Sequence, residues 1–251
     1  MKTPGQSPTP LVTHETIRVE GLSNREFLER HARPGRVGLS CGTTLVDRMI
    51  ARAERHLDAD GRWGCWSHAF IFEGERGDGH QWVIESDLQI ERKHIRLGAQ
   101  ENRITKYFDE TLYTTLAVID FGLAAPQTAG VLREGLERVA GGTRYSLREI
   151  LGTYLALHRP ERRAGENVLA RENSYFCSAF VHHLFRQAGI DLLPGLEVKH
   201  TTPEDISRAS VPHTTWLLQR AVPTSQVAKF AGRVRRRVRA RIKQVKKALQ
   251  N

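Results

Sequence analysis

The sequence predicts an α+β protein built around an antiparallel sheet. Residues 65–72 (CWSHAFIF) are aromatic and β-branched, which is typical of a strand, and residues 81–90 (QWVIESDLQI) have a similar character. The Gly-rich stretch 73–80 between them indicates a chain reversal, so the two strands are expected to form a hairpin. Two later segments, 126–139 and 174–188, place apolar residues at steps of three and four, which predicts helices with one apolar face each.

Shorter elements complete the expected fold. Ser23 followed by Glu26 is a capping-box pattern, and Thr202 followed by Pro203 indicates another helix start. Further strands are expected at residues 14–20, 36–39 and 116–121, and further helices at residues 23–30, 44–56, 146–157 and from Thr202 onward.

The formal charge of +10 comes from one end of the chain. The 251 residues hold 38 Lys and Arg against 28 Asp and Glu, but residues 206–251 contain 12 basic residues and no acidic one. The remainder holds 26 basic and 28 acidic residues, a net of −2. We expect a flexible leader or edge strand at residues 1–25, a main domain at 26–222 and a basic amphipathic helix at 223–251.

Several classes of protein are excluded by composition. No stretch of 18 apolar residues is present, and the first residues lack the apolar core of a secretory signal. The three cysteines, Cys41, Cys65 and Cys177, are too few and too scattered for a disulfide framework, and none is in a C-x-x-C pair. We therefore expect a cytoplasmic protein with reduced cysteines, and no metal or other cofactor is indicated.

The basic C-terminal segment has an apolar stripe at helical spacing, formed by Phe230, Val234, Val238, Ile242, Val245 and Leu249. A basic amphipathic helix suits an anionic membrane surface, which would make the protein peripherally membrane-associated, or a protein partner. The alternative is that the stripe packs on the protein's own body. Nucleic acid is less favoured, because no aromatic residues alternate with the basic ones.

The main candidate for chemistry is Cys177, at or next to the start of the helix predicted at 174–188. Unpaired N–H groups at a helix N-terminus favour a thiolate over a thiol. A thiolate nucleophile needs an imidazole partner, and His68 in the first hairpin strand is the best candidate. The imidazole needs a group that fixes its tautomer, and Glu85 on the second strand suits that role. Asp87 points to the same face by period two and is an alternative.

A register for the hairpin can be derived from its turn. If Phe72 pairs with Gln81, residues whose numbers sum to 153 face each other, and His68 with Glu85 is such a pair. The two side chains would then be direct cross-strand neighbours, with Cβ atoms ~5 Å apart.

Three blocks of this sequence resemble the permuted papain-like cysteine enzymes of the YiiX type, in the NlpC and lecithin:retinol acyltransferase superfamily. The blocks are WSHAFIF followed by VIES, then YFCSAFVHHLF, then TTPEDISRAS. The resemblance spans roughly residues 30–215, except for residues 102–165, which do not align with the family. It implies a circularly permuted papain-like (NlpC-like) fold for the domain at 26–222, with His68, Glu85 and Cys177 in the family's order. It also implies that Tyr175 shapes an oxyanion site.

The resemblance implies a cysteine hydrolase, an amidase or peptidase, that acts on an amide, ester or thioester substrate through a thioester intermediate. Thioesterase or acyltransferase activity on lipid-like acyl groups is an alternative, because the superfamily includes both. A further alternative is a non-catalytic papain-like binding protein attached through its basic tail.

Each candidate residue also has a structural interpretation. Cys177 and His68 could be buried core residues, and Tyr175 by itself suits a core position. Cys41 is a competing nucleophile because it too precedes a predicted helix. His182 and His183 are expected to be packing or surface residues of their helix.

Overall fold

The described part of the chain forms a seven-stranded mixed sheet with helices on both faces. The computed structural model describes residues 14–43, 47, 66–91, 94–142 and 177–220. The chain divides into a unit of residues 1–219, described here, and a second unit of residues 220–251. The strands are β1 (His14–Val19), β2 (Val37–Gly42), β3 (His68–Glu75), β4 (Gln81–Glu91), β5 (His94–Arg103), β6 (Tyr113–Asp120) and β7 (His213–Gln219). The helices are α1 (Asn24–His31), α3 (Ala125–Ala140), α5 (Cys177–Gln187) and α6 (Pro203–Ser207), with 3-10 turns η2 (Ile104–Phe108) and η4 (Val198–His200).

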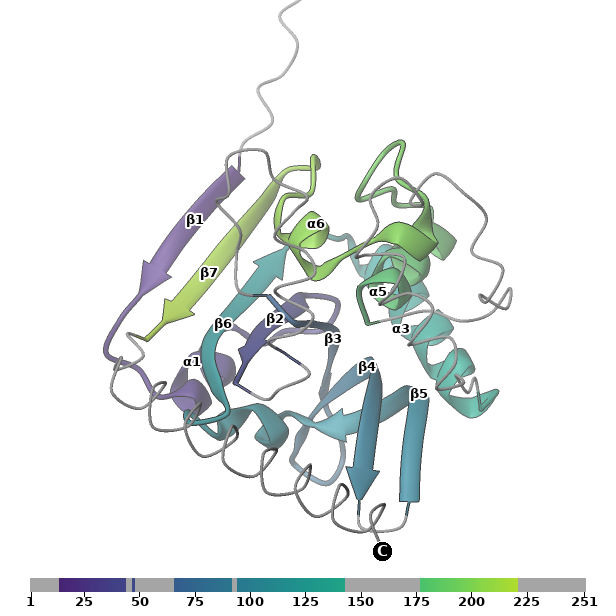
Figure 1. Ribbon diagram of the computed structural model, residues 1–251. Helices are drawn as coiled ribbons and strands as arrows, with labels where there is room; N and C mark the ends of the chain where they lie inside the picture. Colours follow the sequence, from purple (N-terminus) through teal and green to yellow (C-terminus); the bar gives the residue numbers. More distant parts are fainter. Residues whose placement is uncertain (1–13, 44–46, 48–65, 92–93, 143–176, 221–251) are drawn as a thin grey trace, which may run out of the picture. The chain divides into compact units, whose positions relative to one another are not determined.

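The strand order is β1-β7-β6-β2-β3-β4-β5, as Figure 1 shows. Only β1 and β7 pair in parallel; the other neighbours in this sheet are antiparallel. The edge strand expected near residue 14 is therefore confirmed as β1. The first and the last described strands, β1 and β7, therefore lie side by side at this edge.

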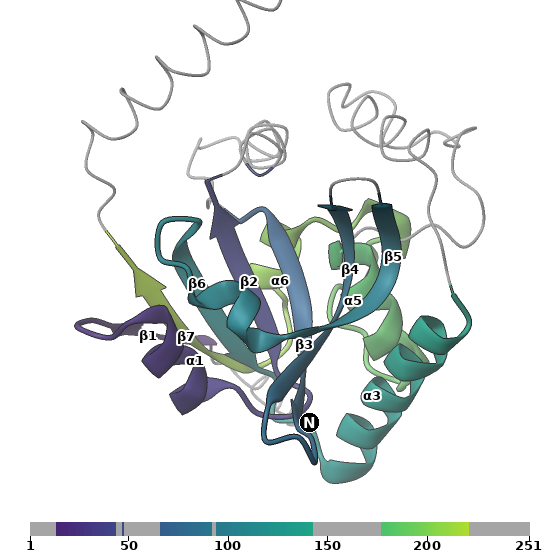
Figure 2. The same cartoon turned by 90° about the horizontal axis from the view of Figure 1, so that it is seen from below.

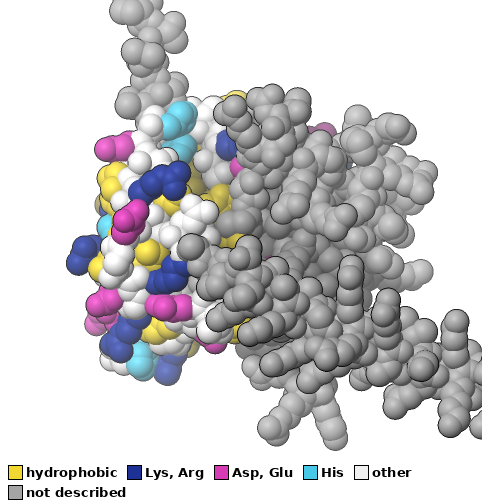
Figure 3. All heavy atoms as spheres, turned by 60° about the vertical axis from the view of Figure 1, so that its left-hand side comes forward, with side chains coloured by type: hydrophobic (Ala, Val, Ile, Leu, Met, Phe, Trp, Pro, Cys, Tyr) yellow, Lys and Arg dark blue, Asp and Glu magenta, His cyan; other side chains and the backbone are white. Residues whose placement is uncertain are grey.

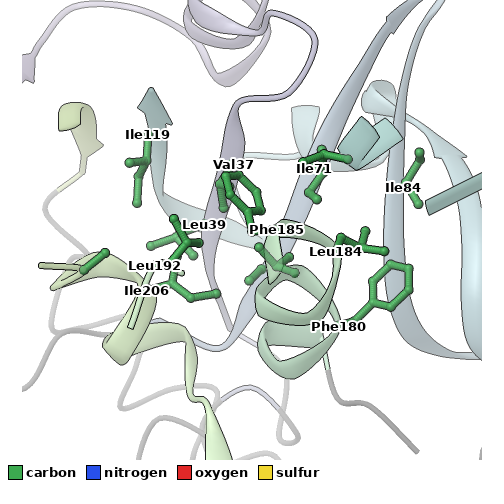
Figure 4. Packing of buried hydrophobic residues seen from close by; sticks show 14 of the residues in the cluster. Val37, Leu39, Ile71, Ile84, Ile119, Phe180, Leu184, Phe185, Leu192 and Ile206 are labelled. Carbon is green, nitrogen blue, oxygen red and sulfur yellow. The ribbon is translucent and has the colours of Figure 1, made fainter. Parts of the chain in front are cut away.

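Each face of the sheet has its own apolar cluster. On one face α5 packs against β3 and β4, and α3 packs against α5. Phe180, Leu184 and Phe185 of α5 lie over Ile71 and the neighbouring strands, as Figure 4 shows. On the other face Phe27 and Leu28 of α1 pack with Phe70, Phe72 and Tyr107. Figure 2 shows α1 and the η2 turn on one side of the strands, and α3, α5 and α6 on the other.

Local sequence signals account for the helix starts. Ser23 caps α1 with a capping box that Glu26 completes, and Thr202 caps α6 in the same way through Asp205. Pro203 occupies the first turn of α6, where a missing N–H is harmless. These two starts and the helix expected at 126–139 are confirmed. The helices expected at 44–56 and 146–157 lie outside the described residues apart from Asp47, as do residues 1–13 and the basic segment 223–251.

The expected hairpin register is wrong. Phe72 lies opposite Val83, not Gln81, and Glu85 lies opposite Phe70, not His68. Strand β3 runs three residues further toward the turn than expected, so that Glu75 and not Phe72 pairs with Gln81. A β-bulge between Phe72 and Gly74 then takes one residue out of the pairing. The net shift is two residues, and because an even shift preserves side-chain faces, His68 and Glu85 still lie on the same face.

None of the described helices is both long and apolar enough to cross a membrane. On the side of the molecule that carries β1 and β7, acidic and basic side chains of the described residues alternate without a large patch of either sign (Figure 3).

Candidate active site

His68 is the first residue of β3, and its imidazole contacts the Glu85 carboxylate of β4. The distance from His68 Nε2 to Glu85 Oε2 is 2.6 Å. Glu85 is a diagonal neighbour because it faces Phe70, and a histidine is long enough to span that diagonal. The His68 side chain is 13% exposed, and the Glu85 side chain is fully buried. Glu85, and not Asp87, is thus the acid at the imidazole.

The Glu85 carboxylate accepts hydrogen bonds on both oxygens. Oε2 faces His68 and accepts from the Tyr107 hydroxyl at 2.5 Å. Oε1 accepts from Asn102 Nδ2 at 2.5 Å and from the Lys106 ammonium at 2.7 Å. Burial alone would raise the pKa of Glu85, but the Lys106 charge and the hydrogen bond with His68 hold that pKa far below its usual range. Glu85 is therefore a buried carboxylate that stays ionised.

Cys177 is the first residue of α5, and its side chain interacts with the His68 imidazole. Since Nε2 of the ring faces Glu85, Nδ1 is the ring nitrogen left for the thiol. Burial lowers the pKa of His68, but the interactions with Cys177 and Glu85 outweigh burial and raise that pKa well above its ordinary value. The raised pKa favours the protonated form of the imidazole, which interacts with the Glu85 carboxylate and the Cys177 side chain.

Helix α5 is fixed so that its first residue meets the start of β3. Its apolar side chains pack on the sheet, as described above. Ser178, next to the candidate nucleophile, donates a hydrogen bond to the Thr201 carbonyl at 2.7 Å. Nδ1 of the fully buried His182 lies 2.7 Å from the Thr201 hydroxyl oxygen. His182 and His183 are both buried, as expected for packing residues of this helix, and burial lowers the pKa of each.

Cys41 follows the residue of β2 that pairs with His68. Its neighbour Ser40 pairs directly with His68 across β2 and β3, and adjacent residues of a strand point to opposite faces. Cys41 accordingly packs against the apolar cluster beneath α5. The thiol that the structure brings to His68 is that of Cys177. Tyr175 lies outside the described residues.

Sequence reasoning missed three contributors to the site. Asn102, Lys106 and Tyr107 belong to residues 102–165, which resemble no family block, and the pattern around these three residues predicts no strand or turn. Tyr107 is fully buried and stacks on Phe70, with ring centroids 4.1 Å apart. Burial and the nearby Glu85 charge raise the pKa of Tyr107 well above its ordinary value, which keeps the hydroxyl a donor. The residues around Lys106 and Tyr107 carry no local pattern that predicts their contact with Glu85.

One group of residues has the composition of a metal site. His68, Glu85 and Asp87 offer ligand atoms within 4.8 Å of one another. The Lys106 ammonium, however, bonds both carboxylates, at 2.7 Å to Glu85 and 2.6 Å to Asp87. A cation already held by both acids supplies the charge that a metal ion would otherwise bring, so this cluster fits an ion-pair network better than a metal centre.

Comparison of the sequence with models of known protein families finds no matching family, and comparison with curated proteins finds no match.

Proposed function

We propose that this chain is a cysteine-dependent hydrolase, an amidase or peptidase, with a permuted papain-like fold. The observation that carries the proposal is the imidazole of His68 between the Cys177 side chain and the buried Glu85 carboxylate. A nucleophile, a base and a group that orients the base are the parts that acyl transfer requires. Their order along the chain supports the permuted arrangement that the sequence blocks resemble.

In the proposed reaction the Cys177 thiolate attacks the substrate carbonyl and forms a carbon–sulfur bond. The His68 imidazolium gives its Nδ1 proton to the leaving amine as the carbon–nitrogen bond breaks, which yields a thioester and a neutral imidazole. Water then attacks the thioester, and its proton passes to His68. The carbon–sulfur bond breaks, the carboxylic acid leaves, and the thiolate–imidazolium pair is restored.

The remaining residues of the site hold this pair in place. Glu85 orients the ring and stabilises the imidazolium through Nε2. The backbone N–H of Cys177, at the start of α5, is suited to stabilise the oxyanion. The role expected for Tyr175 stays a prediction from sequence. With another nucleophile in place of water the same site would be an acyltransferase, and with a thioester substrate it would be a thioesterase.

A burst experiment tests the proposal. The full chain is mixed with p-nitrophenyl acetate at pH 7, and the enzyme is then mapped by peptide mass spectrometry. We expect a p-nitrophenol burst close to the enzyme concentration, with one acetyl group on Cys177. The burst should be lost in Cys177→Ala and unchanged in Cys41→Ala. Acetylation that survives Cys177→Ala and disappears in Cys41→Ala would overturn the assignment, and no acylation of either cysteine would favour a binding protein.

The proposed location is cytoplasmic, with the basic segment 223–251 attaching the protein to an anionic membrane or a protein partner. Sedimentation with vesicles that contain phosphatidylserine, with and without residues 223–251, tests the membrane attachment. Binding that requires residues 223–251 and weakens with salt supports the membrane attachment. Binding that depends neither on these residues nor on the salt concentration contradicts it.

A further inference from the structure

The buried Glu85 carboxylate needs a counter-charge that His68 alone does not supply. The imidazole changes charge during the proposed reaction, whereas the carboxylate must stay ionised throughout. Lys106 is the permanent cation on Glu85, with Nζ 2.7 Å from Oε1. Its side chain is 23% exposed, so the ammonium is largely withdrawn from water at this contact.

Lys106 has a second anionic partner. Its ammonium lies 2.6 Å from Asp87 Oδ2, and Asp87 is on the same strand and face as Glu85. Burial would lower the pKa of Lys106, but the charges of Glu85 and Asp87 raise it above its usual range. Lys106 therefore stays protonated, and its positive charge is shared between the carboxylates of Glu85 and Asp87.

We propose that Lys106 is a positioning residue of the Cys177–His68–Glu85 site, and that Asp87 sets how much of its charge the site experiences. This inference rests on the proposed function. Lys106 bonds the oxygen of Glu85 that does not face the imidazole. It thereby holds the carboxylate in the rotamer that presents its other oxygen to His68.

The arrangement predicts opposite effects for the two charges. Without Lys106, the negative charge of Glu85 and Asp87 is uncompensated, and the imidazolium of His68 is stabilised further. Without Asp87, the whole Lys106 charge bears on Glu85, and the imidazolium is stabilised less. Within the described residues, Tyr107 of η2 and Tyr113 of β6 are further titratable groups that face this cluster. Both stay neutral near pH 7, since burial raises the pKa of Tyr107 well above its ordinary value and that of Tyr113 to about 12.

The test is a ¹⁵N NMR titration of the His68 imidazole, assigned with His68→Gln, in the full chain and without substrate. We expect Lys106→Met to raise the pKa of His68 by about 1 pH unit and Asp87→Asn to lower it by a similar amount. Lys106→Arg should restore the wild-type pKa, because it keeps the charge. Arg103→Met is the matched control, since Arg103 is half-exposed and pairs with Asp78.

A merely structural role for Lys106 would lower stability without moving the two titrations in opposite directions. An unchanged pKa of His68 in Asp87→Asn, or equal shifts in one direction for both variants, would overturn the proposal. If Lys106→Met does not fold, the pKa of His68 in Lys106→Arg and in Asp87→Asn still tests the proposal. The titration needs no turnover, so loss of the burst alone refutes the hydrolase and leaves this result standing.

Discussion

Replacing Glu85 by Gln tests how much the buried carboxylate contributes to the fold. The glutamine amide has nearly the same shape but only one acceptor oxygen. Four donors converge on the carboxylate, two on each oxygen, so the new NH₂ group must face two of them. The least unfavourable orientation keeps the carbonyl toward Lys106 and Asn102 and turns the amide nitrogen toward His68 and Tyr107.

The magnitude follows from the bonds that are lost. This orientation removes two hydrogen bonds to a charged group, each worth about 1.5–3 kcal/mol. It also leaves the imidazolium without its buried counter-charge, which agrees with the 3–5 kcal/mol typical of breaking a buried ion pair. We expect Glu85→Gln to lower the free energy of unfolding by about 3–5 kcal/mol, a large part of the 5–15 kcal/mol of an ordinary domain.

The assay is urea unfolding at pH 7 of the full chain, followed by tryptophan fluorescence. Glu29→Gln is the control: Glu29 is an exposed helix residue paired with Arg25, and its loss should leave the midpoint almost unchanged. Tyr107→Phe removes one of the four donors and should cost about 1 kcal/mol, which keeps the test informative if Glu85→Gln does not fold. Equal midpoints for Glu85→Gln and Glu29→Gln would refute the reasoning.

Three further predictions concern pH, packing and capping. The pKa of Glu85 is depressed in the folded state, so the stability that Glu85 contributes is present above its unfolded pKa of ~4.3 and is lost as pH falls below that value. The pKa of His68 is raised in the folded state, so the stability that His68 contributes is present below its unfolded pKa of ~6.5 and is lost as pH rises through the raised pKa. Urea midpoints measured from pH 3 to 9 should show both slopes, and each should vanish in the variant that removes its group. Gly38→Ala should lower the free energy of unfolding by about 1–3 kcal/mol, because an added Cβ would lie 2.2 Å from an aromatic ring of β3. Gly77→Ala is the control, because an added Cβ there would have nothing within 4 Å. Equal thermal midpoints for the two variants would contradict this prediction. Thr202→Ala should cost about 1 kcal/mol, measured in the same urea assay, and no loss would mean that the capping box is not needed.

Much of the fold could be predicted from sequence, because its signals are local. The capping boxes at Ser23 and Thr202 depend on residues three positions apart, and both form as expected. The apolar period of α5 likewise depends on neighbouring turns. The seven-stranded order could not be predicted, because strand pairing joins segments far apart in the chain, such as β1 with β7.

The site was predictable in part for the same reason. His68, Glu85 and Cys177 stood out by residue type and order, and even a wrong register kept His68 and Glu85 on one face, because the error was two residues. The three extra residues of β3, less the one residue that the bulge between Phe72 and Gly74 leaves unpaired, shift the register by two. No local pattern reveals either feature. Lys106 and Tyr107 reach Glu85 only because η2 folds back beneath β4, and this contact has no signature in the sequence near either residue.

The most direct test of the central claim is the rate at which iodoacetamide alkylates Cys177 at pH 7, compared between the wild-type chain and His68→Ala. The claim is that the imidazole of His68 activates this thiol. It predicts alkylation of Cys177 in the wild type at least tenfold faster than in His68→Ala, with alkylation of Cys41 equal in both. Equal rates at Cys177 in the two proteins would contradict it.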